Sequence, residues 1–178
     1  MPPMGKRHQI SRVPAIAVVV SRYNSSITDR LLEGAVTEYI RRAGHSTALT
    51  IVHAPGAFEL PALARAAAFS GKFAAVVCLG CVVKGDTRHD EYICNAVAAG
   101  LVQITVATGV PCAFGVLTVN NARQAEERAG GDKGNKGQEA MAAALDTIQS
   151  LAALGGPLPV IRLGDTKPDK VAGRRKKR

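Results

Sequence analysis

Four short apolar runs, separated by segments with helical periodicity, constrain the fold of this chain more than any other feature. The runs are AIAVVV at 15–20, ALTIVH at 48–53, FAAVVCLGCVV at 73–83 and CAFGVLTV at 112–119. They are continuous rather than alternating, which is typical of strands buried on both faces of a parallel sheet. We therefore predict a four-stranded parallel sheet.

Helical patterns fill the first two intervals. Ser26 followed by Asp29 resembles a capping box at the start of the first helix, and Gly44 suits its end. An Ala-rich helix is predicted over 61–69. The apolar face of the first helix comprises Ile27, Leu31, Leu32, Ala35, Val36, Tyr39 and Ile40.

Two more helices follow. Thr87, with Asp90 three residues later, is predicted to begin a helix that runs to Gly109, and Asn135 with Gln138 opens the last one. In that last helix one face carries Met141, Leu145 and Ile148. The alternating order predicts an α/β protein, a three-layer α/β/α sandwich with right-handed crossovers. Ligands of such sheets bind where strands end, here in loops 21–26, 54–59, 84–89 and 120–136.

The charge of the chain lies at its two ends. Of the formal net charge of +9, residues 1–12 carry +3 and residues 167–178 carry +6, so the body of the chain is neutral. This weakens any reading of the fold as a nucleic-acid binder, which should present a basic face. We divide the chain into a basic segment at 1–12, one domain at 13–154, and an extended or disordered basic tail at 155–178.

Neither a signal peptide nor an apolar stretch of membrane-spanning length is recognisable, so we expect a cytoplasmic protein with reduced thiols. Cys78 and Cys81 form a CxxC within a predicted strand. Residues three apart on a strand face opposite sides, so we expect two core thiols rather than a metal or redox pair.

The loop KGDTRH at 84–89 suits an anion, because a glycine turn at a helix N-terminus offers free N–H groups. His89 in the first helical turn could transfer protons near neutral pH. The alternative is a plain turn at Gly85 with Thr87 as cap. Glu59 either accepts bonds from ligand hydroxyls or simply faces the helix dipole.

Other candidate site residues also have both a functional and a purely structural interpretation. Tyr23 and Phe114 could stack on a flat ring or pack at the domain edge. Arg128 and Lys136 bracket the Gly-rich stretch at 130–137, which fails as a phosphate-binding P-loop at its second Gly and at its Ser/Thr position. These two cations could hold phosphate or remain solvated in a loop.

Taken together, the segments resemble those of the lumazine synthase family. The matching segments, in the family's order, are SRYN (21–24), PGAFELP (55–61), VVKGDTRHDEYI (82–93), FGVLTVNN (114–121), QAEERAG (124–130) and NKGQEA (135–140). The resemblance implies a flavodoxin-like sandwich with a four-stranded parallel sheet. It also implies pentamers, which in some members build a 60-subunit icosahedral capsid, with active sites between subunits.

The implied activity is that of a transferase in the penultimate step of riboflavin biosynthesis. It condenses 5-amino-6-(D-ribitylamino)uracil with 3,4-dihydroxy-2-butanone 4-phosphate to 6,7-dimethyl-8-ribityllumazine, phosphate and water. Neither a metal nor an organic cofactor is implied.

The resemblance also implies roles for single residues. His89 would transfer protons. Phosphate would be bound by Asp86, Thr87 and Arg128, with Lys136 adding charge. The other substrate would be held by Tyr23, Ala57, Phe58, Glu59, Cys81, Val82 and Val83, and by Phe114 of a neighbouring subunit. The chain departs from the family pattern at Tyr23 (commonly Phe or Trp), Lys84 (frequently Arg) and Asp90 (usually aromatic).

Three alternatives stay open. The chain could be a non-catalytic shell or flavin-binding homologue, although the joint presence of Glu59, His89 and Arg128 argues against this. The basic tail could bind nucleic acid or acidic cargo, against the favoured reading as a solubilising end. A related riboflavin-forming enzyme would use two lumazine molecules instead.

Overall fold

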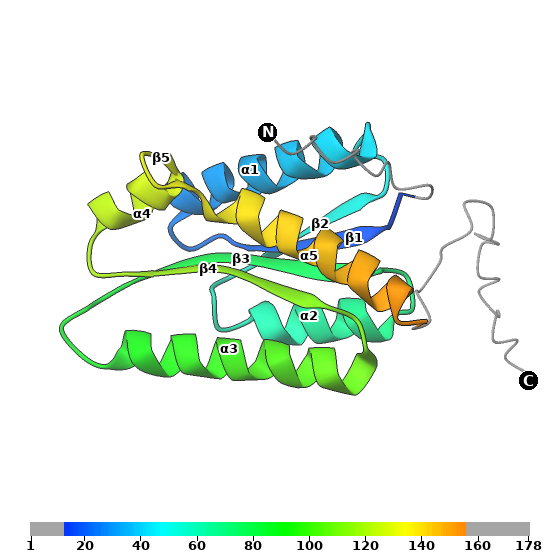
Figure 1. Ribbon diagram of the computed structural model, residues 1–178. Helices are drawn as coiled ribbons and strands as arrows, with labels where there is room; N and C mark the ends of the chain where they lie inside the picture. Colours follow the sequence, from blue (N-terminus) through cyan, green and yellow to red (C-terminus); the bar gives the residue numbers. More distant parts are fainter. Residues whose placement is uncertain (1–12, 156–178) are drawn as a thin grey trace, which may run out of the picture.

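A four-stranded, all-parallel sheet forms the centre of the protein in a computed structural model that describes residues 13–155 (Figure 1). The strands are β1 (Ile16–Ser21), β2 (Leu49–Ala54), β3 (Ala75–Val83) and β4 (Cys112–Val119). Their order across the sheet is β2-β1-β3-β4. The predicted parallel sheet is therefore confirmed, with β1 and β3 in its interior.

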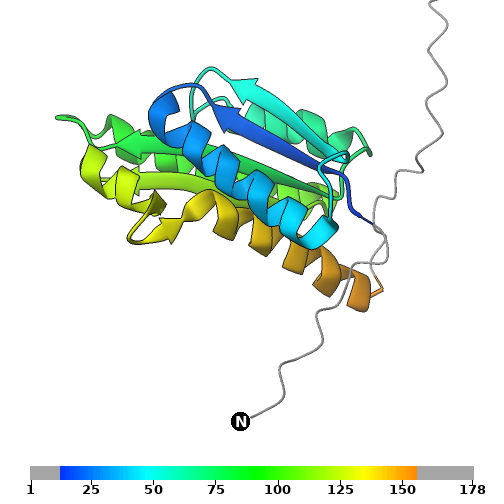
Figure 2. The ribbon, with the colours of Figure 1, turned by 90° about the horizontal axis from the view of Figure 1, so that it is seen from above.

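Helices cover both faces of the sheet. The helices are α1 (Ser25–Ala43), α2 (Leu60–Phe69), α3 (His89–Thr108), α4 (Ala122–Arg128) and α5 (Lys136–Ala153). Figure 1 shows α1, α4 and α5 on one face and α2 and α3 on the other, and Figure 2 shows α1 and α5 side by side. Leu31 and Met141 belong to the core on the first face, and Leu60 and Leu101 to the core on the second. This is the predicted flavodoxin-like, three-layer α/β/α sandwich.

Two of the predicted helix starts are wrong. Helix α1 begins at Ser25 after Asn24, whose φ is 60° and whose side chain does not cap the helix, so Ser26 and Asp29 form no capping box. The side chain of Asn24 bonds across to β3 instead, so a tertiary contact replaces the local cap. Helix α3 begins at His89 rather than Thr87, because the preceding residues remain in the turn.

The two glycines predicted to end helices are confirmed in that role. Gly44 and Gly109 adopt φ of 84° and 71°, and their N–H groups donate to carbonyls of the last helical turns of α1 and α3. These left-handed positions favour glycine because a Cβ would be strained there.

Strand β2 is not buried on both faces, so the prediction is wrong for this strand. Thr50, Ile51 and His53 are exposed, with Ile51 retaining 44% of its accessible surface. The strand lies at the edge of the sheet and pairs only with β1, so its apolar run does not reflect a fully buried position. At the opposite edge, Phe114 and Thr118 of β4 are also exposed.

Residues 120–136, predicted as one loop, contain a helix and a hairpin. Asn121 caps the short helix α4 by accepting the N–H of Gln124 at 3.0 Å. Strands β5 (Ala129–Gly131) and β6 (Gly134–Asn135) then pair in antiparallel fashion. A seven-residue helix is too short to show a clear apolar period, which explains why the sequence pattern missed it.

Within residues 13–155, no helix is both long and apolar enough to cross a membrane. The same part of the chain contains no cluster of three His, Cys, Asp or Glu side chains that could hold a metal ion. The predicted basic segment at 1–12 lies outside the described residues, as does the tail beyond Gly155.

Candidate active site

The loops that follow the four parallel strands are tied together at one edge of the sheet. The N–H of Arg22 donates to the carbonyl of Ala54 at 2.8 Å, which joins the loops after β1 and β2. The amide Nδ2 of Asn24 donates to the carbonyl of Cys81 at 2.9 Å, which joins the β1 loop to the end of β3. The N–H of Lys84 donates to the carbonyl at the end of β4 at 2.8 Å. The loops predicted to bind ligands therefore lie together at the end of the sheet where its strands have their carboxyl termini.

Tyr23 lies in the middle of this edge, after the central strand β1. Its side chain is 70% exposed, whereas its N–H donates to Oγ of Ser21 at 3.2 Å. The buried hydroxyl of Thr28 donates to the carbonyl of Ser21 at 2.7 Å and fixes the strand end from below. A rigid backbone thus presents an aromatic ring to solvent beside β3.

The PGAFELP segment presents one carboxylate. Ala57 is buried, Phe58 is 61% exposed, and Glu59 is half-buried at the start of α2. The carboxylate of Glu59 makes no capping bond to α2, which speaks against a purely local role. A Cβ at Gly56 would lie 3.0 Å from Oε2 of Glu59, so the glycine leaves room for this side chain.

The end of β3 supplies an apolar wall. Cys81 and Val82 are buried and Val83 is half-buried. Burial raises the pKa of the Cys81 thiol to about 11, so this thiol is neutral at physiological pH. Cys78 belongs to the core on the α2 and α3 face and Cys81 to the core on the α1 face, which confirms that the CxxC thiols point to opposite sides.

The turn after β3 leads directly into α3. Asp86, Thr87 and His89 are all exposed, and His89 is the first helical residue. No side chain caps α3, so its first N–H groups keep the partial positive charge of a helix N-terminus. This geometry suits an anion beside an imidazole that can exchange protons.

The two candidate cations lie on the other face of the sheet. Arg128 is in the last turn of α4, where its Nη1 donates to the carbonyl of Gln124 at 3.1 Å. Lys136 is the first residue of α5 and pairs with Glu139. Since α4 and α5 pack on the α1 face, the sheet separates them from the α3 helix that begins at His89 (Figure 1).

Phe114 is also remote from these loops within one chain. It pairs with Cys78 in register, five residues before Val83 and Val119 at the strand ends. At about 3.3 Å per residue this places it about 17 Å away along the strand. Its side chain is 41% exposed. One chain therefore brings together the residues after β1, β2 and β3, but not Phe114 or Arg128.

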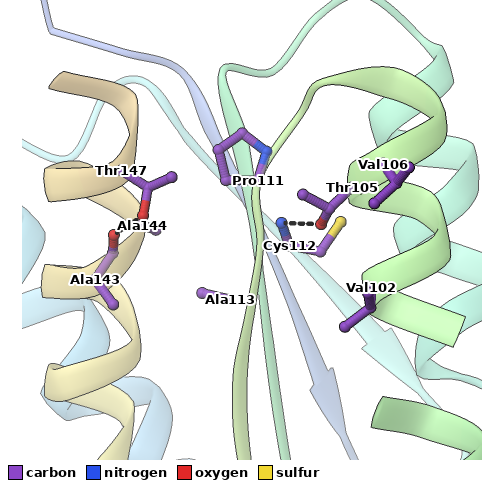
Figure 3. A pocket seen from close by; sticks show the side chains of 9 residues that line it. All are labelled: Val102, Thr105, Val106, Pro111, Cys112, Ala113, Ala143, Ala144 and Thr147. Atoms are coloured by element: carbon purple, nitrogen blue, oxygen red, sulfur yellow. Dashed lines mark hydrogen bonds between the residues drawn. The ribbon is translucent and has the colours of Figure 1, made fainter. Parts of the chain in front are cut away.

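An apolar hollow lies at the amino-terminal end of β4, near Phe114 in the sequence. Its volume is about 290 Å³, and Figure 3 shows its lining side chains from α3, β4 and α5. The N–H of Cys112 donates to Oγ1 of Thr105 at 3.0 Å, which joins β4 to α3 beside the hollow. Val102 and Val106, which line the hollow from α3, are 63% and 81% exposed. This edge of the sheet thus presents an uncovered apolar surface.

Two residues of the NKGQEA segment have an architectural role that the sequence pattern did not reveal. Asn135 accepts the N–H groups of Gly137 and Gln138 and donates its Nδ2 to the carbonyl of Arg30 at 2.8 Å. A Cβ at Gly137 would lie 1.9 Å from the carbonyl oxygen of Leu31. The sequence predicts the cap on α5 by Asn135, but it does not predict that the backbone of α1 packs against Gly137. A glycine inside a helical pattern is the one local sign of such a close contact.

Residues 14–152 match the protein family described as 6,7-dimethyl-8-ribityllumazine synthase. The match spans the whole parallel sheet, helices α1 to α4, α5 up to its penultimate residue, and every loop described above. It therefore includes each candidate residue that the sequence analysis identified. This chain of 178 residues belongs to the 6,7-dimethyl-8-ribityllumazine synthase family, a family of transferases in riboflavin biosynthesis.

Proposed function

We propose that this protein condenses 5-amino-6-(D-ribitylamino)uracil with 3,4-dihydroxy-2-butanone 4-phosphate and releases 6,7-dimethyl-8-ribityllumazine, phosphate and water. Family membership supports the reaction class. The observation that carries the proposal for this chain is the joining of the β1, β2 and β3 loops. The bonds from Arg22 to Ala54 and from Asn24 to Cys81 tie the loops of Tyr23 and Glu59 to the end of β3, and this supports a shared site at that end of the sheet.

The uracil would bind between Tyr23 and the end of β3. The exposed ring of Tyr23 offers a stacking face, and Val82 and Val83 offer an apolar wall. The neutral thiol of Cys81 adds no charge to this slot. Ala57, Phe58 and Glu59 would hold the ribityl chain, with the uncapped carboxylate of Glu59 accepting hydrogen bonds from its hydroxyls.

The phosphate of the second substrate would bind at the turn before α3. Backbone N–H groups around Asp86 and Thr87 would point at its oxygens, as at other helix N-termini. The guanidinium of Arg128 would add a second, charged contact, and Lys136 would raise the local positive potential.

The separation of these groups supports a site shared by two chains. Arg128 ends α4, on the face of the sheet opposite α3, and Phe114 lies five residues before the end of β4, so neither lies with the loop at His89 within one chain. A neighbouring copy would supply both. The apolar surface around Val102 and Val106 supports such a neighbour, because isolated chains seldom leave such a surface uncovered. We therefore propose a homo-oligomer, either a pentamer or a 60-mer built of pentamers, with active sites between subunits.

The chemistry needs a proton shuttle and two aligned substrates. The amine of the uracil attacks the ketone and loses water to form an imine, phosphate leaves, and the ribitylamino nitrogen then closes the ring with loss of a second water. His89 would move protons during imine formation and phosphate elimination. Holding two substrates in contact would supply most of the acceleration. We expect His89 to contribute at or below the usual ~10²–10⁴-fold of general acid–base groups.

Lumazine fluorescence tests the proposal directly. Assembled protein is mixed with both substrates, and product and phosphate are followed for the parent, His89→Ala and a control, His45→Ala. His45 is exposed and bonds Thr47 far from the loops, so its variant should match the parent. Equal product formation with and without protein would refute the catalytic reading and favour a non-catalytic shell or flavin-binding homologue.

A further inference from the structure

Glu127 stands among three cations on and beside α4. Its Oε1 lies 3.4 Å from Nη1 of Arg123, and its Oε2 lies 3.6 Å from Nη1 of Arg128 and 3.9 Å from Nζ of Lys133. The side chain of Glu127 is only 20% exposed. None of the roles proposed above uses this carboxylate.

The backbone of Glu127 is held as firmly as its side chain. Its carbonyl accepts the N–H of Lys133 at 2.9 Å, which ties α4 to the β5–β6 hairpin. Gly131 approaches so closely that a Cβ there would lie 2.9 Å from Cα of Glu127. The hairpin thus fixes the position from which the carboxylate faces Arg128.

The guanidinium of Arg128 is committed at one nitrogen. Nη1 donates to the carbonyl of Gln124 at 3.1 Å and also faces Oε2 of Glu127. Within the described part of the chain, Nε and Nη2 have no recorded partner. Those two nitrogens form one side of the planar guanidinium, and that side can donate two parallel bonds to a phosphate.

We propose that Glu127 is a positioning residue that orients Arg128 for the phosphate of the substrate. The inference rests on the proposed function and assigns a role to a residue that does not touch substrate. The hydrogen bond to Gln124 and the ion pair with Glu127 restrict a long, flexible side chain before the ligand arrives, so less freedom is lost on binding.

The charge of Glu127 acts in the opposite direction. A carboxylate near a phosphate repels it, so removing that charge would by itself strengthen phosphate binding. Loss of positioning in Glu127→Gln would raise the KM for the butanone phosphate, whereas loss of repulsion would lower it. The cations that face Glu127 are 34% to 80% exposed, so these ion pairs contribute little to stability. Glu127→Gln should therefore leave the fold intact and report on the direction in which phosphate binding changes.

The experiment compares Glu127→Gln with Glu126→Gln in full-length, assembled protein. Glu126 is exposed and has no recorded ion pair within residues 13–155, which makes it a matched control. We expect Glu127→Gln to raise both the KM for the butanone phosphate and the inhibition constant of inorganic phosphate about two- to fivefold. The KM for the uracil should not change, and Glu126→Gln should match the parent.

A second arm uses the double variant Glu127→Gln with Arg128→Ala. If Glu127 acts through Arg128, the Gln substitution raises the KM for the butanone phosphate no further once Arg128 is gone. A persisting rise would overturn the inference, as would an unchanged or lowered KM for the phosphate substrate in the single variant, or an equal rise in both KM values.

Failure of the proposed function is distinguishable from failure of this inference. If the parent makes no lumazine, the function fails, and calorimetric titration with inorganic phosphate then tests Glu127 alone. Weaker phosphate binding by Glu127→Gln than by Glu126→Gln would still support positioning. Equal binding would overturn it.

Discussion

Gly137 is the position where a single methyl group should cost the most. Its Cβ would stand 1.9 Å from the carbonyl oxygen, 2.6 Å from the carbonyl carbon and 2.9 Å from the Cα of Leu31. All three atoms belong to the backbone of α1, so no side chain can rotate away. Since ordinary contacts to a Cβ exceed 3.4 Å, Gly137→Ala must displace α1 or α5 by more than 1 Å.

The cost can be worked out from this geometry. Overpacking a well-packed site typically costs about 1–3 kcal/mol, and a backbone clash belongs at the upper end. Alanine recovers up to about 1 kcal/mol of helix propensity, so we expect a net loss of about 2–3 kcal/mol. For a chain of this size that lowers the Tm by about 4–12 °C.

Thermal unfolding followed by circular dichroism measures the loss. Parent and variant must be compared at the same protein concentration, because assembly stabilises the folded chain. Gly85→Ala is the matched control, since nothing lies within 4 Å of its added Cβ and its φ is not positive. A Tm for Gly137→Ala within about 1 °C of the control would refute the contact between α1 and α5 as described.

Three further predictions concern other parts of the chain. Asn135→Ala should lower the free energy of unfolding by about 1–2 kcal/mol, measured by urea titration, because it removes the cap of α5 and the bond to α1. The pKa of Glu38 lies below its ordinary value chiefly because Arg41 donates hydrogen bonds to the carboxylate. The ionised carboxylate therefore stabilises the folded state. This contribution is complete above the unfolded pKa of about 4.3 and is lost as the pH falls through the lower folded pKa. Glu38→Gln should therefore be less stable than the parent at pH 7, with a difference that shrinks in acid; a constant difference would contradict this. Iodoacetamide at pH 8 should modify half-buried Cys94 before Cys81, whose thiolate fraction is only about one in a thousand, and peptide mass spectrometry would show the reverse order if this is wrong.

The architecture was predictable because each level of the sequence pointed to the same arrangement. Continuous apolar runs alternate with helical patterns, and Gly44 and Gly109 end their helices as predicted. The edge strand β2 broke the rule because an apolar run does not reveal whether a strand has one neighbour or two. Ile51 is apolar and yet remains 44% exposed.

Tertiary contacts explain the remaining misses. Asn24 bonds to Cys81, far away along the sequence, and this contact moves the helix start away from the local capping pattern. Glu38 pairs with Arg41 and Arg42 on its own helix, and its 2% exposure reflects the packing of α5, from which Nε2 of Gln138 donates to Oε2 of Glu38 at 3.5 Å. Neither the bond of Asn24 nor the burial of Glu38 has a local signature.

The candidate site was predictable as a set of residues but not as a geometry. The loops after β1, β2 and β3 converge as strand order requires, which follows from the parallel sheet alone. Phe114 and Arg128 do not join them within one chain. A site completed by a second copy of the chain depends on assembly, which the sequence predicts only through its resemblance to the family.

Mixing two impaired variants tests the central claim, a catalytic site shared between two chains. His89→Ala removes the proposed proton shuttle and Arg128→Ala removes the proposed phosphate contact. The two variants are co-expressed in equal amounts so that they assemble together. If the groups come from neighbouring chains, about a quarter of the interfaces pair a wild-type His89 with a wild-type Arg128. Lumazine formation should then rise well above that of either variant, towards about a quarter of the parent rate. A co-assembled mixture that only averages the two variants would contradict the shared site.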